Sequence, residues 1–409
     1  MTNNIYVLKF GGSSVGSSKR IIDIAKKLLK ISHTKPRLVV VVSAMGDTTD
    51  SLVSLAKEVS RNPHPREYDA LVSTGENISA ALLAMALQDL GQKAISLTGP
   101  QAGIHTEKIY SKAKIRRVNP SRILQELDNK AIVIVTGFQG LNEYNDVTTI
   151  GRGGSDTSAV VLAAALKAKE CHIYTDVEGV FTTDPRIVPH ASKLHEISYH
   201  EMLELSVLGA KVLHPRAVEC AQEYDIVLHV RSSFSNEEGT RVKKESQMEV
   251  QRAVTGVTVN ENEAKVAILK VPDKPGTAGH IFERLSEANI NVDVIIQSIE
   301  EDHINSIAFT VHKDDLSKTK IVVKKLIEEG SAQGIKTDAS IAKISIVGVG
   351  MISTPGIAAR FFNALARKGI NIKHISTSAI KVSCIIDKKE SKKAIRAVHD
   401  EFELDKINK

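Results

Sequence analysis

Cysteine, long apolar runs and aromatic residues beside basic clusters are all scarce in this chain. The three cysteines, Cys171, Cys220 and Cys384, are odd in number and far apart, which argues against a disulfide framework. No apolar run approaches the roughly 20 residues needed to span a bilayer, and a lysine, Lys9, follows after only eight residues. We therefore expect a cytoplasmic protein that does not insert into a membrane.

The charge pattern gives no sign of a nucleic-acid partner. The net charge of +6 arises from 54 Lys+Arg against 48 Asp+Glu, and these residues are spread along the chain. The densest basic stretch, Lys388–Arg396, contains Glu390, is followed by Asp400, and lacks interleaved aromatics. We interpret it as the solvated face of a helix and expect no nucleic-acid binding.

Strands and helices alternate in the first half of a chain whose 409 residues suggest two or three domains. This alternation predicts an α/β fold with a mostly parallel sheet between helices, and ligands at the carboxyl ends of the strands. The expected strands are Ile5–Phe10, Leu38–Val42, Ile132–Val135 and His172–Thr175, and the expected helices are Lys19–Lys30, Asn77–Leu90 and Ser158–Lys169.

An internal repeat with an offset of 80 positions follows a polar stretch, Ser232–Gln251. It pairs Pro275-Gly276 with Pro355-Gly356, Phe282 with Phe362, Leu285 with Leu365, and Ile290-Asn291 with Ile370-Asn371. Each copy has a strand, a Pro-Gly turn, an amphipathic helix and a second strand, which indicates duplicated small domains rather than a solenoid. We predict a first domain over 1–234, a linker over 235–252, and two α+β modules of βαββαβ topology over 253–335 and 336–409.

The stretch Thr149–Asp156 combines glycines with an arginine and an aspartate directly before an apolar helical run. Glycines allow a close approach of the backbone to a ligand, and a helix beginning here would direct free N–H groups at an anion. Arg152 supplies a planar fork that suits a carboxylate or a phosphate. Taken alone, such a loop is more often a simple turn.

Two further loops place polar and charged residues at the ends of predicted strands. Lys9–Gly16 offers backbone amides for phosphates and a lysine for charge on a phosphoryl group, although Ser17-Ser18 replace the Lys-Ser/Thr of a P-loop. A strand-to-helix turn is the plain alternative. Thr175, Asp176 and Arg186 follow another strand and suit the ribose and phosphates of a nucleotide.

A zinc site is not expected at His195-Glu196. The second histidine, His200, lies five residues after the first, roughly 140° away on a helix, whereas the zinc-protease pattern needs a spacing of four. We predict no protein-bound metal from these residues.

Together the motifs resemble the aspartate kinases in content and in order. The matching stretches are Lys9–Gly16, Ser43–Thr49, Thr74-Gly-Glu76, Thr148–Asp156 and Thr175–Arg186. The resemblance covers essentially the whole chain. It implies an amino-acid-kinase fold with paired ACT modules, and transfer of the ATP γ-phosphate to the side-chain carboxylate of L-aspartate with Mg²⁺, which is the entry step to lysine, threonine and methionine synthesis.

The resemblance also implies a role for individual residues. Arg152 is expected to bind the α-carboxylate of aspartate and Glu76 its ammonium, with Ser43, Thr49, Gly153, Gly154 and Ser155 near the acceptor. Lys9 is expected to stabilise the transferred phosphoryl, positioned by Asp156 and aided by Gly11 and Gly12. The expected nucleotide-binding residues are Lys9, Phe10, Gly11, Gly12, Thr175, Asp176, Phe181, Arg186 and Lys211. A carboxylate acceptor is already ionised at neutral pH and needs no general base, which agrees with the lack of an evident His/Asp base pair.

In the regulatory half, the resemblance implies feedback by lysine, threonine or both, and a homo-oligomer formed through the ACT modules. The expected effector-binding residues are Asp273, Gly276, Asn291 and Asn371, although the asparagines could simply shape the strand entries. Ala379 stands where the family usually has Glu, which leaves an effector at the second module open. An internal start near Met248 could yield a separate regulatory subunit.

Two other functions remain open from the sequence. The first domain could be an inactive scaffold for an amino-acid sensor, although Lys9, Glu76, Arg152 and Asp156 all stand in their family positions. A glutamate or acetylglutamate kinase is the alternative enzyme, but that resemblance would not bring the carboxyl-terminal repeat.

Overall fold

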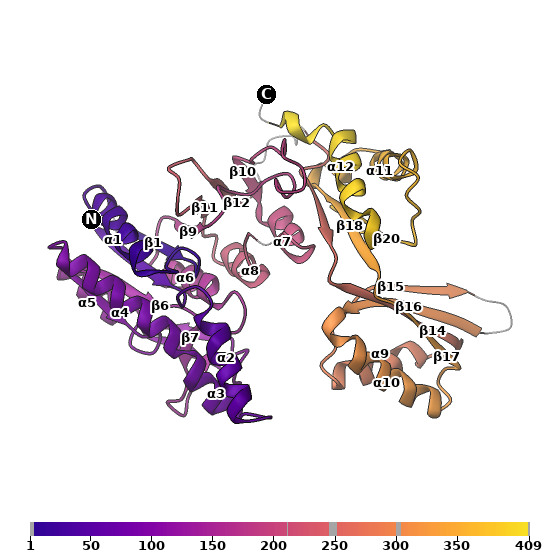
Figure 1. Cartoon of the computed structure of the whole chain (residues 1–409), viewed down its shortest axis with the longest axis horizontal. Coiled ribbons are helices and arrows are strands. Elements are labelled where there is room, and N and C mark those ends of the chain that lie inside the picture. The colour runs from indigo at the N-terminus through magenta and orange to yellow at the C-terminus, as the bar shows by residue number, and fades with distance from the viewer. Residues whose placement is uncertain (1–3, 211, 245–251, 300–303, 408–409) are drawn as a thin grey trace. The chain divides into compact units, whose positions relative to one another are not determined.

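The computed structural model describes residues 4–210, 212–244, 252–299 and 304–407 (Figure 1). The chain divides into two compact units, Met1–Phe181 with Lys193–Glu249, and Thr182–Ser192 with Val250–Ile407. The first unit contains the Gly-rich loops, and the second contains the repeat.

An eight-stranded sheet forms the centre of the first unit, with the order β10-β12-β11-β9-β1-β2-β6-β3. All neighbouring strands are parallel except β11 and β12, which confirms the predicted α/β class. The strands are β1 (Ile5–Phe10), β2 (Arg37–Val42), β3 (Ala94–Leu97), β6 (Ile132–Thr136), β9 (Cys171–Thr175), β10 (Glu196–Ser198), β11 (Leu228–Ser232) and β12 (Thr240–Lys243).

Helices cover both faces of this sheet because its central strands are apolar on both sides. The apolar side chains of α1 and α4 share one core cluster with Leu8 and Phe10 of β1. Side chains alternate along a strand, so Lys9 points to the opposite face, where α6 packs on β1. The helices are α1 (Ser18–Ser32), α2 (Thr48–Val59), α3 (Pro65–Val72), α4 (Thr74–Asp89), α5 (Ser121–Asp128), α6 (Gly154–Ala165), α7 (Tyr199–Val207) and α8 (Pro215–Glu223).

A second, four-stranded sheet in the first unit has the order β5-β4-β7-β8. Its strands are β4 (Ile104–Thr106), β5 (Ile115–Val118), β7 (Gln139–Leu141) and β8 (Val147–Thr149), and α3 packs on β8. The neighbouring stretch Pro65–Asp89 has the length and composition of a membrane span. It comprises two helices, α3 and α4, is half buried in the protein, and carries the buried carboxyl groups of Asp69 and Glu76.

The first module of the second unit has the predicted βαββαβ order. Its strands pair antiparallel in the order β15-β16-β14-β17, with apolar faces of two helices in the core. The elements are β14 (Glu263–Pro272), α9 (Thr277–Glu287), β15 (Val292–Ile299), β16 (Ile304–His312), α10 (Leu316–Glu328) and β17 (Gly334–Asp338), with the short 3₁₀ helix η1 (Lys313–Asp315).

The second module differs from the prediction because its fourth strand comes from earlier in the chain. The sheet order is β13-β18-β20-β19, and β13 precedes the first module in sequence. The first module is therefore inserted into the second. The elements are β13 (Gly256–Asn260), β18 (Ile341–Val347), α11 (Ile357–Ala366), β19 (His374–Thr377), β20 (Lys381–Asp387) and α12 (Ser391–Glu401), with η2 (Val349–Ser353), η3 (Lys388–Glu390) and η4 (Leu404–Lys406).

The predicted domain boundaries need three corrections. Strand β12 lies in the main sheet, so the first domain does not end at 234 and residues 235–252 are not a linker throughout. Thr240 and Val242 are fully buried and alternate with exposed or half-buried neighbours, a pattern hidden by the polar composition around them. Residues Thr182–Ser192 belong to the second unit, and β13 belongs to the second module rather than the first.

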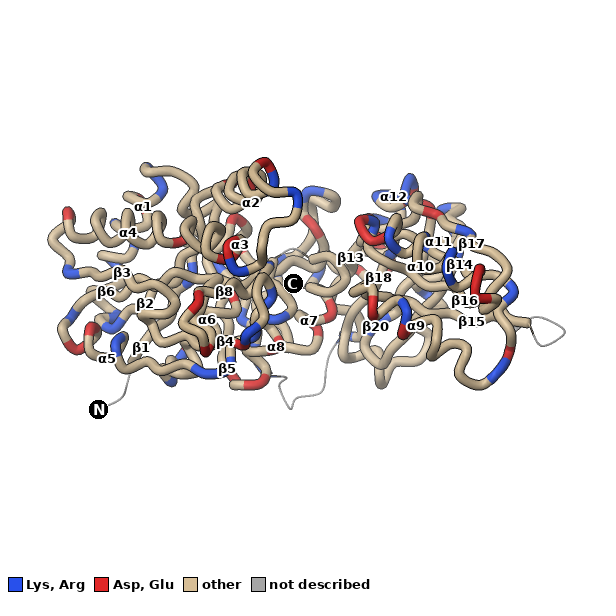
Figure 2. The backbone as a smooth tube through the Cα atoms, turned by 90° about the horizontal axis from the view of Figure 1, so that it is seen from below, with Lys and Arg blue, Asp and Glu red and all other residues tan. Residues whose placement is uncertain are grey.

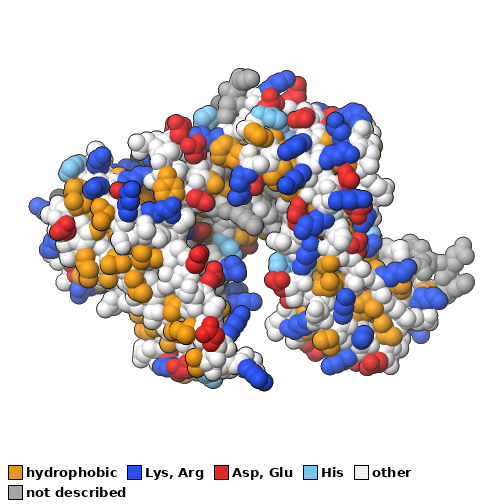
Figure 3. Space-filling model, in the orientation of Figure 1, with side chains coloured by type: hydrophobic (Ala, Val, Ile, Leu, Met, Phe, Trp, Pro, Cys, Tyr) orange, Lys and Arg blue, Asp and Glu red, His pale blue; other side chains and the backbone are white. Residues whose placement is uncertain are grey.

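Charged residues of both signs are interspersed along both units (Figure 2). On the face shown in Figure 3, basic, acidic and apolar side chains are likewise interspersed. The basic stretch Lys388–Arg396 spans η3 and the start of α12, where Ala394 and Ile395 are buried while Lys392 and Lys393 are exposed. It is a solvated helix face, as predicted.

Candidate active site

Lys9 and Asp156 form an ion pair between the end of β1 and the first turn of α6. Lys9 Nζ lies 2.5 Å from Asp156 Oδ1, and the two side chains are 11% and 13% exposed. A side chain on Gly11 would lie 3.4 Å from the same Nζ, so the amine sits beside the backbone of the first Gly-rich loop. The structure thus brings together the predicted lysine, its positioning carboxylate and the loop.

The loop after β1 packs closely against the loop after β2. Gly12 O accepts a 3.1 Å hydrogen bond from Gly46 N, and a Cβ on Gly12 would lie only 3.0 Å from Ala44 O. Ser43 N donates to Phe10 O at 3.1 Å, and Ser43 and Thr49 are both half-buried near this junction, at the end of β2 and in the first turn of α2. Glycine is needed at position 12 because two backbones meet there.

Glu76 is a buried carboxyl group in the first turn of α4. Its Oε1 accepts a 3.1 Å hydrogen bond from Ala44 N, and no described residue hydrogen-bonds to its buried Oε2. Only 3% of the residue is exposed, and this burial raises the pKa of Glu76 to about 7. An incoming ammonium group would satisfy the free oxygen and favour the ionised form.

The loop that precedes α6 uses a left-handed glycine as the helix N-cap. Gly153 has a φ of +70°, and a Cβ there would lie 2.1 Å from Cγ of His214. Gly154 and Ser155 begin the helix, with a Cβ on Gly154 meeting Phe138 at 2.9 Å. Arg152 is exposed at the tip of the loop, where its guanidinium can reach a ligand.

His214, to which no sequence motif assigns a role, lies beside this loop. Its ring packs on Gly153, and burial lowers its pKa more than the nearby Asp156 carboxylate raises it. The neutral imidazole therefore packs against the backbone at the N-terminus of α6. Only the close approach of Gly153 reveals this contact, because 61 positions separate the two residues in the sequence.

The predicted nucleotide residues are only partly assembled. Thr175 ends β9, beside the Lys9 strand, and its Oγ1 donates to Asp176 Oδ1 at 3.0 Å. Phe181 is half-buried at the edge of the first unit and bridges to Lys193. Arg186 belongs to the second unit and pairs with Asp184, with Nη2 2.8 Å from Oδ2. Lys211 lies outside the described residues.

Comparison with protein families matches residues 4–232 to the amino acid kinase family, and residues 265–330 and 344–402 to ACT domains. Among curated proteins, the chain is 49% identical over 400 residues to an aspartokinase of Bacillus sp. (strain MGA3), covering 98% of this chain and 97% of the relative. It is 49% identical over 402 residues to aspartokinase 2 of Bacillus subtilis (strain 168), covering 98% of each. The chain belongs to the aspartokinase family.

Solved aspartokinases have the same fold. The structure of E. coli aspartokinase III in complex with aspartate and ADP has a TM-score of 0.82 and 25% identity, covering 97% of this chain and 99% of that one. An aspartate kinase from Synechocystis is 47% identical with a TM-score of 0.55, covering 98% of this chain and 69% of that one. The aspartokinase fold therefore extends over both units.

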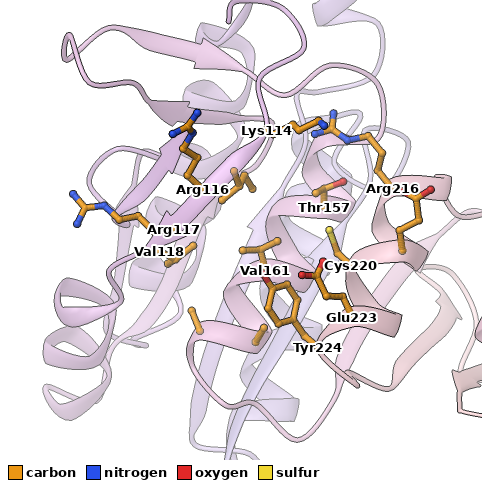
Figure 4. A pocket seen from close by; sticks show the side chains of 14 residues that line it. Lys114, Arg116, Arg117, Val118, Thr157, Val161, Arg216, Cys220, Glu223 and Tyr224 are labelled. Carbon is orange, nitrogen blue, oxygen red and sulfur yellow. The ribbon is translucent and has the colours of Figure 1, made fainter. Parts of the chain in front are cut away.

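A cavity in the described part of this aspartokinase lies beside the Lys9 site rather than in it. It has a volume of about 520 Å³ and runs along α6, between α6, α8 and β5 (Figure 4). Thr157, one turn after Gly153, lines one end, and Glu223 and Tyr224 line the other. Its wall is mixed, with Val161 between charged residues of β5 and α8. Nothing in it marks a particular ligand.

Glu170, His172 and His229 place three ligand-type atoms within 4.8 Å of one another. His172 Nε2 lies 3.0 Å from Glu170 Oε2, and burial lowers the pKa of His229 to about 4. After burial, His172, Arg231 and Arg241 contribute to this lowered pKa, and the two guanidinium groups produce a positive potential at the group. That potential also disfavours a bound cation, so we assign no metal here.

The predicted effector residues are exposed in the two ACT modules. Asp273, Gly276, Asn291 and Asn371 are all accessible. Gly276 caps α9 with a φ of +92°, and Gly356 caps α11 with a φ of +89°. The predicted Pro-Gly turn therefore occurs in both modules, and its glycine forms the same left-handed helix cap each time.

Proposed function

We propose that this aspartokinase transfers the γ-phosphoryl group of ATP to the side-chain carboxylate of L-aspartate, which gives 4-phospho-L-aspartate for lysine, threonine and methionine synthesis. The observation that carries the proposal is the Lys9–Asp156 pair at the carboxyl end of β1, next to the Gly11–Gly12 backbone. Two further residues belong to the proposed site: Glu76, whose buried carboxyl group can pair with an ammonium group, and Arg152, whose exposed guanidinium can pair with a carboxylate.

The reaction brings two anions together, so charge neutralisation is its main requirement. The acceptor carboxylate has a pKa near 3.9 and attacks without a general base. Lys9 Nζ offsets the charge on the transferred group, and Asp156 holds that amine in place. The backbone N–H of Gly12 can donate to a phosphate oxygen, whereas Gly11 N already donates to Tyr174 O at 3.2 Å and so shapes the loop.

Substrate selection follows from the charge of the amino acid. Arg152 pairs with the α-carboxylate, Glu76 pairs with the ammonium, and Ser43 and Thr49 lie near the acceptor, with Gly153, Gly154 and Ser155 presenting the N-terminus of α6. Thr175, Asp176 and Phe181 are the described candidates for further nucleotide contacts. The side chain of Phe10, which was also predicted to contact the nucleotide, is fully buried in the core and stacks on Tyr174. Arg186 and Lys211 complete that set by family resemblance alone.

Mg²⁺ accompanies ATP and shields its phosphates. A magnesium ion bound with a nucleotide takes most of its ligands from phosphate oxygens and water. Asp156 is already paired with Lys9, so we assign no ligand of the ion to it. The chain needs no dedicated metal cage for this.

Feedback control through the ACT modules completes the proposal. Lysine, threonine or both bind at Asp273, Gly276, Asn291 or Asn371 in a homo-oligomer formed through these modules, and favour an inactive state. Met248, the candidate internal start of a separate regulatory subunit, lies outside the described residues.

The deciding experiment measures ADP release and hydroxamate-trapped acyl phosphate with aspartate, glutamate and N-acetylglutamate as acceptors. We expect product with aspartate and little with the other two. Activity with glutamate or N-acetylglutamate instead would identify the alternative enzyme, and no product with any acceptor would identify a sensor scaffold.

A further inference from the structure

Asp69 is a carboxylate at the centre of four hydrogen bonds on α3, and it is fully buried. Its Oδ2 accepts from the backbone N–H groups of Ser111 and Thr149, each at 2.8 Å. Its Oδ1 accepts from the hydroxyls of the same two residues, at 3.1 and 2.9 Å. No ion pair of Asp69 occurs among the described residues, so its charge is compensated by these donors.

The two segments that Asp69 holds also contact each other. Ala113 N donates to Thr149 O at 3.0 Å, and a Cβ on Gly151 would lie 3.1 Å from Ser111 O. Ser111 has a φ of +67°, a left-handed conformation that a non-glycine residue adopts only when its surroundings stabilise it. Two bonds from Asp69 to Ser111 provide that stabilisation.

Two segments of the proposed amino-acid site connect to the Asp69 carboxylate: the loop with Arg152, the cationic pole of the site, and the helix with Glu76, its anionic pole. Thr149 lies three residues before Arg152, in the loop that leads into α6 and Asp156. On the other side, Asp69 lies in the last turn of α3, its carbonyl accepts from Ser73 N at 3.1 Å, and α4 with Glu76 follows at once.

We infer that Asp69 is a positioning residue of the kinase site: it ties the Arg152 loop to the helix pair that carries Glu76, and so fixes the spacing between the cationic and anionic poles. The inference rests on the proposed function, because that spacing matters only for a zwitterionic substrate. Four donors converge on the two oxygens, and a neutral amide weakens this arrangement: it removes the negative charge, and its NH₂ group would require the Ser111 and Thr149 hydroxyls to accept rather than donate.

The test compares Asp69→Asn with Asp146→Asn by steady-state kinetics on the full chain. Asp146 also joins α3 to a neighbouring loop, accepting from Arg66 at 3.1 Å and Tyr110 at 2.9 Å, but it is partly exposed and precedes β8, six positions before Arg152. For Asp69→Asn we expect the KM for aspartate to rise roughly 10- to 100-fold, because a small misplacement of a binding group is costly. The KM for ATP should change less than about 2-fold. Asp146→Asn should leave both constants unchanged.

A purely structural role would lower the melting temperature and the active fraction, hence the apparent kcat, and leave both KM values unchanged; that result would overturn the inference. If Asp69→Asn does not fold, Thr149→Val removes a single hydroxyl donor from the carboxylate. This variant should raise the KM for aspartate by roughly 3- to 10-fold, and an unchanged KM would overturn the inference equally. A wild-type protein without aspartate kinase activity would instead overturn the proposed function, and this inference with it.

Discussion

Glu76 Oε1 accepts a 3.1 Å hydrogen bond from Ala44 N, which ties the first turn of α4 to the loop after β2. The other oxygen is buried, with no hydrogen-bond partner among the described residues. Burial without full compensation is the cause of the raised pKa, about 7. A carboxyl group in this state is ready to ionise when a cation arrives.

The pH dependence of catalysis should reflect Glu76. Below about pH 7 the free enzyme carries the protonated form, which cannot pair with the ammonium of aspartate. We expect kcat/KM for aspartate to fall tenfold per pH unit below that value, since this ratio reports ionisations of the free enzyme. A pH profile in which kcat/KM stays flat down to pH ~5.5 would contradict the assignment of Glu76.

Glu76→Gln should stabilise the fold at high pH while impairing substrate binding. The folded-state pKa of about 7 lies above the ordinary value of 4.5, so the folded protein holds this proton more tightly than the unfolded chain. The carboxyl group therefore lowers the free energy of unfolding as pH rises from about 4.5 to 7, and the full loss persists above that range. We expect the variant to gain on the order of 1–3 kcal/mol at pH ~8 and nothing at pH ~4, measured by urea unfolding. Glu58→Gln, an exposed change on α2, is the control.

Lys9→Ala should abolish turnover without unfolding the protein. Loss of one preorganised charge at the transferred group costs roughly 10²–10³ in kcat. Circular dichroism should still show the wild-type spectrum, with a somewhat lower melting temperature because Asp156 loses its counter-ion. Lys19→Ala, an exposed change on α1, should retain full activity. Near-wild-type turnover in Lys9→Ala would refute the assignment of the site.

Gly153→Ala should be far more damaging than Gly369→Ala. Both glycines are left-handed, with φ of +70° and +66°, so each substitution carries a backbone cost of about 1 kcal/mol. At Gly153 the new Cβ would also lie 2.1 Å from His214, whereas nothing lies within 4 Å of a Cβ at Gly369. We expect Gly153→Ala to lose activity and several degrees of melting temperature, and Gly369→Ala to keep its activity. Similar effects at both positions would argue that the His214 contact is unimportant.

Millimolar lysine, threonine or the pair should inhibit the wild-type enzyme. Asn291→Ala should raise the inhibitory concentration, because Asn291 is an exposed amide at the entry to β15 in the first module. Asn371→Ala should change it less, because Ala379 replaces the usual Glu in the second module. Inhibition curves for the three proteins decide this, and indifference to every amino acid derived from aspartate would refute feedback control.

Local sequence patterns predicted four strands and three helices of the first unit, although α4 and α6 begin three and four residues before their predicted starts and elements such as α2, α3 and β12 were not predicted. Alternating apolar residues predict β1 and β9 to within one residue, and the glycines after β1 mark a place where backbones meet. The ion pair of Lys9 with Asp156 is a consequence of strand periodicity, which turns Lys9 toward α6. The repeat of Pro-Gly at positions 275 and 355 predicts the two left-handed helix caps.

The sequence by itself determined which segments are strands and helices and which loops carry charge, because those properties depend on neighbours a few positions apart. Only the tertiary structure decided that β13 completes the second module across an inserted first module, that β12 joins the main sheet, and that Asp69 holds Thr149 and Ser111. The pairings of β13 with β18, of β12 with β10 and of Asp69 with its donors join residues 42 to more than 80 positions apart, where several partners of similar polarity compete. The choice among them is made by packing and by the need of each buried polar group for a hydrogen-bond partner, which no local pattern encodes.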